Sequence, residues 1–273
     1  MTLYDRIGSG YDTTRRADPG LVRRLLELLA VPAGSRCLDI ACGTGNYTAA
    51  LAEAGLRMVG VDVSRRMLSS ARARSGAVRW VNGDAAALPF ADGAFEAAVC
   101  TLALHHFSEP ERAFREIARV LDTSQGAARL VIFTADPEQM RRYWLTEYFP
   151  DAMAHAIRQM PPVEPMLALL GAAGFTRITR VPWSITPDLQ DLFLYSGKYR
   201  PELYLAPGVR AGISTFATLA DPAEVERGCA RLRADIASGR FEDVQRAAEH
   251  PDGDYLLLIA SRASSLPQER PMT

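Results

Sequence analysis

Short apolar runs alternate with amphipathic segments over the first half of the chain. Each run has the length of a buried strand, and the segments between them have the apolar spacing of helices. The predicted strands cover residues 37–41, 58–63, 78–81, 97–102 and 130–133, and the predicted helices cover residues 47–54, 65–74 and 110–121. Strand and helix alternating in this way predict right-handed βαβ units around a parallel sheet.

The pattern changes after Thr134. A helix is predicted at 163–174, and two further strands are predicted at about 177–181 and 255–260. The roughly seventy residues between these strands are too many for an unstructured loop in a compact domain. The sequence therefore predicts an α/β fold of Rossmann-like type. It has a seven-stranded, mostly parallel sheet flanked by helices, and a mainly helical insertion lobe between strands 6 and 7.

This pattern divides the chain into five expected segments. They are an N-terminal arm and cap helix (1–35), a Rossmann-like cofactor-binding core (36–136), an aromatic segment that completes the core (137–182), the insertion lobe (183–253), and a last strand with a flexible tail (254–273).

Composition and charge limit the classes of function. The 31 basic and 32 acidic residues leave a net charge of −1, so the chain lacks the positive field that binds nucleic acid. No stretch has the length and apolar character of a membrane span, and the N-terminus lacks the apolar core of a signal peptide. The four cysteines are not spaced as a metal or redox site. We therefore predict a cytoplasmic protein that binds no metal.

The most informative stretch is residues 38–48, in which a predicted strand runs into a glycine turn and then a helix. Gly43 and Gly45 would let the backbone approach a ligand closely, because a Cβ atom at either position would fill the space that the ligand needs. The third glycine of the dinucleotide fingerprint is absent, since Thr48 stands in its place.

Two carboxylates follow at the ends of the next two strands. Asp62 lies nineteen residues after Gly43, where an adenosine ribose would lie. Asp84 follows the third strand, where it can accept a hydrogen bond from an adenine amino group. Together with the glycine turn they predict an adenosine site. Asp39, near the mouth of the turn, suits an ammonium and a sulfonium better than two phosphates, although bracing the turn is an alternative role for it.

The runs LDIACGTGNYT, GVDVS, NGDAAALPF and FEAAVCTLALHHF, with the segment 112–121, resemble the class I S-adenosylmethionine-dependent methyltransferases. The likeness is greatest to the branch that methylates quinones and natural products, and it covers about residues 36–134. It implies S-adenosylmethionine as cofactor and S-adenosylhomocysteine as product. The reaction implied is in-line transfer of the methyl group to a small-molecule acceptor, flat or apolar and of quinone or natural-product type.

The resemblance also assigns residues to the cofactor. Acidic and small residues at the strand ends would border the methionine moiety (Asp39, Gly43, Gly45), the ribose (Asp62) and the adenine edge (Asp84, Ala85). Apolar side chains would pack on the adenine faces, although any α/β core contains such residues: Val63, Met67 and Leu102. In the N-terminal arm, Tyr11 would cover the sulfonium and Arg16 would pair with the methionine carboxylate, unless both are solvated.

On the acceptor side, His105 is the candidate base, because histidine titrates near neutral pH and relatives use the first histidine of the pair 105–106 in this way. A structural histidine is the alternative, and the assisting carboxylate of such relatives is replaced by Thr134. Aromatic side chains would line the acceptor pocket or, alternatively, only hold the lobe to the sheet: Tyr143, Trp144, Tyr148 and Phe193.

Two other functions fit parts of the pattern. An NAD-dependent oxidoreductase would share the adenosine site, but the missing third glycine argues against it. A non-catalytic cofactor-binding protein of the same fold would bind the cofactor without transferring its methyl group.

Overall fold

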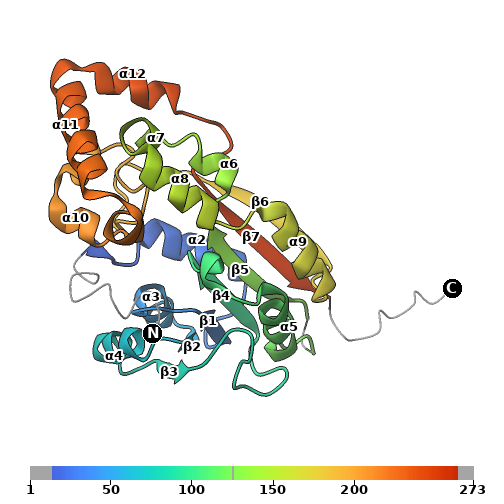
Figure 1. Ribbon diagram of the computed structural model, residues 1–273. Helices are drawn as coiled ribbons and strands as arrows, with labels where there is room; N and C mark the ends of the chain where they lie inside the picture. Colours follow the sequence, from blue (N-terminus) through green and yellow to red (C-terminus); the bar gives the residue numbers. More distant parts are fainter. Residues whose placement is uncertain (1–13, 125, 264–273) are drawn as a thin grey trace. The chain divides into compact units, whose positions relative to one another are not determined.

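The computed structural model describes residues 14–124 and 126–263, which contain a seven-stranded sheet (Figure 1). The strand order is β3-β2-β1-β4-β5-β7-β6. The strands are β1 (Arg36–Ile40), β2 (Arg57–Asp62), β3 (Arg79–Asn82), β4 (Ala97–Thr101), β5 (Ala128–Thr134), β6 (Arg177–Trp183) and β7 (Tyr255–Arg262). The pairs β1–β2, β1–β4, β2–β3 and β4–β5 are parallel. The predicted Rossmann-like fold is confirmed.

Helices follow β1, β2 and β4, whereas a segment without a helix joins β3 to β4, and further helices lie in the second part of the segment between β6 and β7. The α-helices are α2 (Pro19–Leu29), α3 (Asn46–Glu53), α4 (Arg65–Arg74), α5 (Pro110–Val120), α6 (Pro137–Met140), α7 (Leu145–Tyr148), α8 (Pro150–Gln159), α9 (Val163–Ala172), α10 (Pro207–Ala211), α11 (Pro222–Ser238) and α12 (Arg240–Ala247). Short 3-10 or π turns are η2 (Leu104–His106), η3 (Pro201–Leu205) and η4 (Thr215–Leu219). The segment between β6 and β7 is therefore helical in its second part.

The chain forms two compact units. The core unit comprises the described residues of 24–133, 163–181 and 258–263, and the lobe unit comprises 14–23, 134–162 and 182–257. This division differs from the one expected from the sequence, because residues 137–162 group with the lobe, and only 163–181 complete the core.

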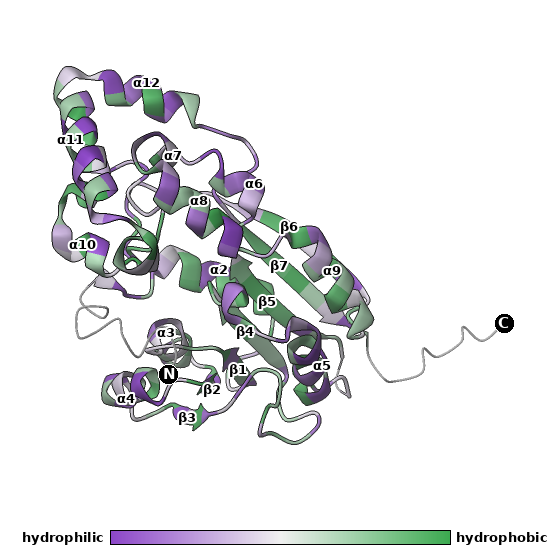
Figure 2. Ribbon diagram, in the orientation of Figure 1, coloured by the Kyte–Doolittle hydropathy of each residue, from purple (hydrophilic) through white to green (hydrophobic). Residues whose placement is uncertain are grey.

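In the core unit, apolar strands lie at the centre of the sheet. β4 and β5 are almost wholly buried, and both are green in the hydropathy colouring (Figure 2). Continuous burial is typical of parallel strands covered on both faces. The edge strand β3 instead exposes Arg79 and Asn82. Helices α3 and α4 pack beside β2, and α5 packs against α9. Ser64 caps α4 by accepting a hydrogen bond from the Met67 amide, as its position predicts.

In the lobe unit, aromatic rings and buried polar contacts form the interior. Tyr143 stacks on Tyr195 with ring centroids 3.9 Å apart. The Lys198 ammonium lies 2.9 and 3.0 Å from the two carboxylate oxygens of Asp254, and both side chains are less than 10% exposed. This ion pair joins the segment after β6 to the residue before β7. Among the described residues, no helix is long and apolar enough to cross a membrane.

Candidate functional site

The glycine turn after β1 is held in a tight conformation. The Gly45 amide donates to the Cys42 carbonyl over 2.9 Å, and the Cys42 amide donates to the Val61 carbonyl of β2 over 3.0 Å. Gly43 and Gly45 have φ angles of 56° and 75°, which disfavour residues with a Cβ atom. Ala41 adopts the same left-handed region, with φ at 54°. The turn therefore carries backbone strain at a position where the chain has alanine.

Gly43 and Gly45 differ in what surrounds them. A Cβ atom on Gly43 would meet no atom within 4 Å, which leaves space for a ligand. A Cβ atom on Gly45 would lie 2.2 Å from the Trp80 ring. The predicted reason for glycine at position 45 was therefore wrong, because a protein side chain takes up this space and not a ligand.

Asp62 at the end of β2 fastens the turn. One carboxylate oxygen accepts a hydrogen bond from the Gly43 amide over 2.9 Å, and the other accepts one from the Ser64 amide over 2.8 Å. The side-chain amide of Asn82 donates to the carbonyls of Asp62 and Val63 over 2.9 Å each. Asp62 thus lies beside Gly43 in a fixed orientation.

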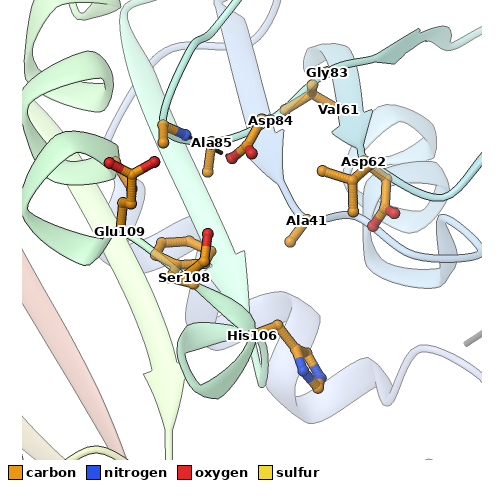
Figure 3. A pocket seen from close by; sticks show the side chains of 13 residues that line it. Ala41, Val61, Asp62, Gly83, Asp84, Ala85, His106, Ser108 and Glu109 are labelled. Atoms are coloured by element: carbon orange, nitrogen blue, oxygen red, sulfur yellow. Dashed lines mark hydrogen bonds between the residues drawn. The ribbon is translucent and has the colours of Figure 1, made fainter. Parts of the chain in front are cut away.

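A pocket lies at the carboxyl ends of β1 and β2 and beside the turn after β3. In this turn Asp84 forms an isolated β-bridge with Ala87, and its carboxylate accepts a hydrogen bond from the Ala86 amide over 2.9 Å. Figure 3 shows the carboxylates of Asp62 and Asp84 and the small side chains of Ala41 and Ala85 around this pocket. The lining is completed by Val61, Val63, Gly83, Ala86, His106, Phe107, Ser108, Glu109 and Ala113. Ligands of open α/β sheets bind at this edge of the sheet.

The turn after β3 is clamped by helix α5. Glu116 accepts a hydrogen bond from the Leu88 amide over 2.9 Å, and Arg119 donates to the carbonyls of Leu88 and Phe90 over 3.0 and 2.8 Å. Arg119 in turn pairs with Glu116 over 2.7 Å. The segment that carries Asp84 is therefore held by paired charges on a helix.

Asp39 is a buried carboxylate of β1 that does not itself line the pocket. Its side chain is 1% exposed, and one oxygen accepts a hydrogen bond from the Thr48 hydroxyl over 2.6 Å. The other oxygen, Oδ1, has no hydrogen-bond partner in the described residues. Burial, partly opposed by the Thr48 bond and reinforced by Asp62, raises the pKa of Asp39 to about 7. An unpaired buried carboxylate oxygen fits the ammonium group of the expected cofactor.

The residues expected on the adenine faces lie at different depths. Val63 is 51% exposed and lines the pocket. Met67 is buried in α4 and does not line it. Leu102 has a left-handed φ of 52° just after β4, and its amide donates to the Phe133 carbonyl over 2.7 Å. The structure therefore brings Val63, but not the other two, to the pocket lining.

His105 and His106 lie in the turn η2 that follows β4. Their ring centroids are 3.8 Å apart. Burial, with a smaller effect of the neighbouring ring, lowers the pKa of His105 to about 3, so its imidazole is neutral at pH 7. The Nδ1 atom of His105 is buried and has no hydrogen-bond partner among the described residues. His106, and not His105, lines the pocket.

The candidate acceptor residues lie in the lobe unit and are almost fully buried there. Their exposed fractions run from 1% to 3% for Tyr143, Trp144, Tyr148 and Phe193. Trp144 and Tyr148 meet edge to face, and Trp144 donates from its indole nitrogen to the Lys198 carbonyl over 3.1 Å. Tyr143 and Phe193 contact other aromatic rings of the lobe unit, Tyr195 and Tyr255. Tyr143 and Trp144 also line a second pocket, which lies in the lobe unit.

The N-terminal residues can be followed from Thr14. Arg15 forms a two-point ion pair with Asp191, with distances of 2.6 and 3.1 Å. Arg16 is exposed, and Tyr11 lies outside the described residues. Arg15, and not the exposed Arg16, thus forms this ion pair within the lobe unit. In the described part of the chain, no cluster of potential metal ligands is found.

Several residues at the site escaped the sequence interpretation. Trp80, Arg74 and Asn82 hold the turn and the end of β2, and Ser108 and Glu109 line the pocket. The role of Trp80 could have been inferred from its bulky ring lying opposite Gly60 on the neighbouring strand. That pairing, however, is known only once the register of β2 and β3 is known.

Comparisons with known proteins point to one family. Residues 38–126 match a family model described as a methyltransferase domain. A demethylmenaquinone methyltransferase of Paenarthrobacter aurescens is 31% identical, over 65% of this chain and 79% of the relative. A demethylmenaquinone methyltransferase of Thermus thermophilus is 30% identical, over 64% of this chain and 91% of the relative.

Similarity among solved structures extends further along the chain. A structure from Anabaena variabilis, assigned to a methyltransferase of an antibiotic biosynthesis pathway, is 35% identical with a TM-score of 0.80. The match covers 90% of this chain and 98% of that one. The relatives give no support to the oxidoreductase alternative. The chain belongs to the class I S-adenosylmethionine-dependent methyltransferases, enzymes that transfer a methyl group from this cofactor, here to a small-molecule acceptor.

Proposed function

We propose that the pocket of the core unit holds S-adenosylmethionine along the ends of β1, β2 and β3. Asp39 and the glycine turn face the methionine moiety, Asp62 the ribose, and Asp84 with Ala85 the adenine edge. The observation that carries this assignment is the unpaired Asp39 oxygen, buried beside a turn whose Gly43 leaves open space. When bound, the cofactor supplies an electrophilic methyl group on a sulfonium.

We propose an acceptor of natural-product type, flat or apolar, and related in shape to a quinone. The relatives that are named for quinone methylation match about two thirds of this chain. The antibiotic-pathway structure covers 90% of it, and the remaining tenth is shorter than the segment between β6 and β7. That structure thus shares most of the insertion lobe, the region that we expect to select the acceptor.

For His105, we propose contact with the acceptor. A neutral imidazole with an unpaired buried nitrogen can form a hydrogen bond with an acceptor hydroxyl. Because its pKa is about 3, the ring orients the acceptor better than it stores a proton. The other proposed groups are Tyr11 and Arg16 beside the cofactor and the aromatic residues of the lobe beside the acceptor. The cytoplasmic location stays a prediction.

The test is a thermal shift with S-adenosylhomocysteine. The wild-type protein is expected to melt at a higher temperature with this ligand, and Asp84→Ala and Asp62→Ala to lose most of the shift. Asp243→Ala removes an exposed carboxylate of α12 and is expected to keep the full shift. No shift for wild-type protein would contradict the proposed cofactor site.

The acceptor is sought in a second experiment. Methyl-labelled cofactor is incubated with the enzyme and a panel of quinones, phenols and amines, and labelled products are identified by mass spectrometry. Label on a flat phenol or quinol supports the proposed class. Label confined to aliphatic amines would contradict it.

A further inference from the structure

The glycine turn is held by side chains of the neighbouring β2–α4–β3 segment, through hydrogen bonds and packing. Asp62 binds the Gly43 amide, as described above, and the guanidinium of Arg74 at the end of α4 donates to the Thr44 carbonyl over 3.0 Å. The peptide groups before Gly43 and after Thr44 are therefore held by side chains that lie outside the turn. A turn with two glycines has many accessible conformations, so these contacts select one of them.

Trp80 of β3 supports the same turn by packing. Its ring lies so close that a Cβ atom built on Gly45 would be 2.2 Å away, and one built on Gly60 would be 2.6 Å away. The indole nitrogen donates to the Ser75 carbonyl over 3.0 Å, which anchors the ring to the end of α4. Trp80 therefore fills the gap between the turn and β2, and no smaller side chain can fill it.

Neither side chain belongs to the pocket. Trp80 and Arg74 are absent from its lining, which includes Asp62 and Ala41 at either side of the turn. We expect any effect of these two side chains on a ligand to pass through the turn, because Arg74 donates to the Thr44 carbonyl and the Trp80 ring packs against Gly45.

We propose that Trp80 and Arg74 are positioning residues that set the glycine turn in the conformation that binds S-adenosylmethionine. The inference rests on the proposed cofactor role of the turn. Misplacement of binding groups by about 1 Å can lower reaction rates by about a hundredfold. For binding, we expect loss of either contact to raise the dissociation constant of S-adenosylhomocysteine by about tenfold.

A double-mutant cycle tests the packing contact. Gly60→Ala adds a methyl group that meets the Trp80 ring and pushes it toward Gly45, and dissociation constants for S-adenosylhomocysteine are measured by calorimetry. Gly60→Ala is expected to weaken binding about tenfold in the wild-type background and much less in a Trp80→Ala background, where the added Cβ still lies 2.9 Å from the Cys42 Sγ atom. Gly76→Ala, whose added Cβ would meet nothing within 4 Å, is the matched control with unchanged affinity.

Kinetics separate positioning from mere stability. Arg74→Gln and Trp80→Phe are expected to raise the KM for the cofactor while kcat at saturation changes less than twofold, with Trp80→Phe closer to wild type than Trp80→Ala. A purely structural role would lower the melting temperature and leave KM unchanged.

The outcomes distinguish this inference from the proposed function. If the wild-type protein fails to bind S-adenosylhomocysteine, the proposed function itself falls. If wild type binds and both Gly60→Ala and Arg74→Gln bind equally well, the positioning role is overturned. The same holds if the effects of Gly60→Ala and Trp80→Ala simply add. Should Trp80→Ala not fold, Gly60→Ala and Arg74→Gln decide the question on their own.

Discussion

Replacing Asp39 by asparagine is expected to stabilise the protein and to weaken its binding of the cofactor. Burial raises the pKa of Asp39 from 3.8 to about 7. Each pKa unit corresponds to about 1.4 kcal/mol, so a shift of about three units amounts to about 4 kcal/mol against the ionised form. Asparagine carries no charge and its side-chain oxygen can still accept the hydrogen bond from Thr48.

The sign of the pH dependence follows from the protons bound. Between pH 4 and 7 the folded protein holds a proton on Asp39 that the unfolded chain has lost. The free energy of unfolding of the wild type therefore falls as the pH rises through this window and levels off above it. Asp39→Asn lacks this loss. Its free energy of unfolding is therefore expected to exceed that of wild type by up to about 4 kcal/mol at pH 8 and by about 1 kcal/mol at most at pH 4.5.

Urea unfolding at pH 4.5, 6 and 8 measures the effect. Asp243→Asn, an exposed carboxylate paired on the surface of α12, is the control and should follow wild type at each pH. Equal free energies of unfolding for wild type and Asp39→Asn at pH 8 would contradict a raised pKa of Asp39. A stability advantage of the variant that grows as the pH falls would contradict it as well. In parallel, the variant should bind S-adenosylmethionine more weakly, because the ammonium loses its buried counter-charge.

Two further substitutions probe strain and buried charge. Ala41→Gly relieves a left-handed φ of 54° and should raise the free energy of unfolding by about 1 kcal/mol; Ala30→Gly, with φ at 49°, is the matched comparison, and a destabilised Ala41→Gly would contradict the assignment of strain. Lys198→Met leaves the Asp254 carboxylate buried without its cation and should lower the free energy of unfolding by about 3–5 kcal/mol in urea titrations; a loss below about 1 kcal/mol would show that the carboxylate finds another partner.

The predicted elements of the core unit lie within about two residues of those observed, because their apolar runs are bounded by clear polar segments. The predicted helix 65–74 coincides with α4, and the predicted strand 58–63 is β2 shifted by one residue. Asp62 could be placed for the same reason, since the carboxyl ends of parallel strands share one edge of the sheet. The helical character of the insertion lobe was expected from its length and from its aromatic and proline content.

What the sequence could not show depends on contacts between distant residues. The Trp80 ring meets Gly45 only because β3 pairs with β2 in a register that sets it opposite Gly60. Lys198 and Asp254 are 56 residues apart in the sequence, so their ion pair can be recognised only in the folded structure. The aromatic residues after 137 were expected to line an acceptor pocket or, alternatively, to hold the lobe to the sheet, and composition cannot separate these two roles.

The unfavourable features of the core unit gather where the strand order reverses, between β1 and β4. Ala41 and Leu102 each adopt a left-handed backbone just after one of these strands, which costs of order 1–2 kcal/mol each. Asp39 lies on β1 with one oxygen unpaired. A cationic ligand that pairs with Asp39 offsets its buried charge, so the same carboxylate lowers the stability of the empty enzyme and raises its affinity for the cofactor. A variant that gains stability at pH 8 without losing affinity would separate these two effects and place the unpaired oxygen away from the ligand.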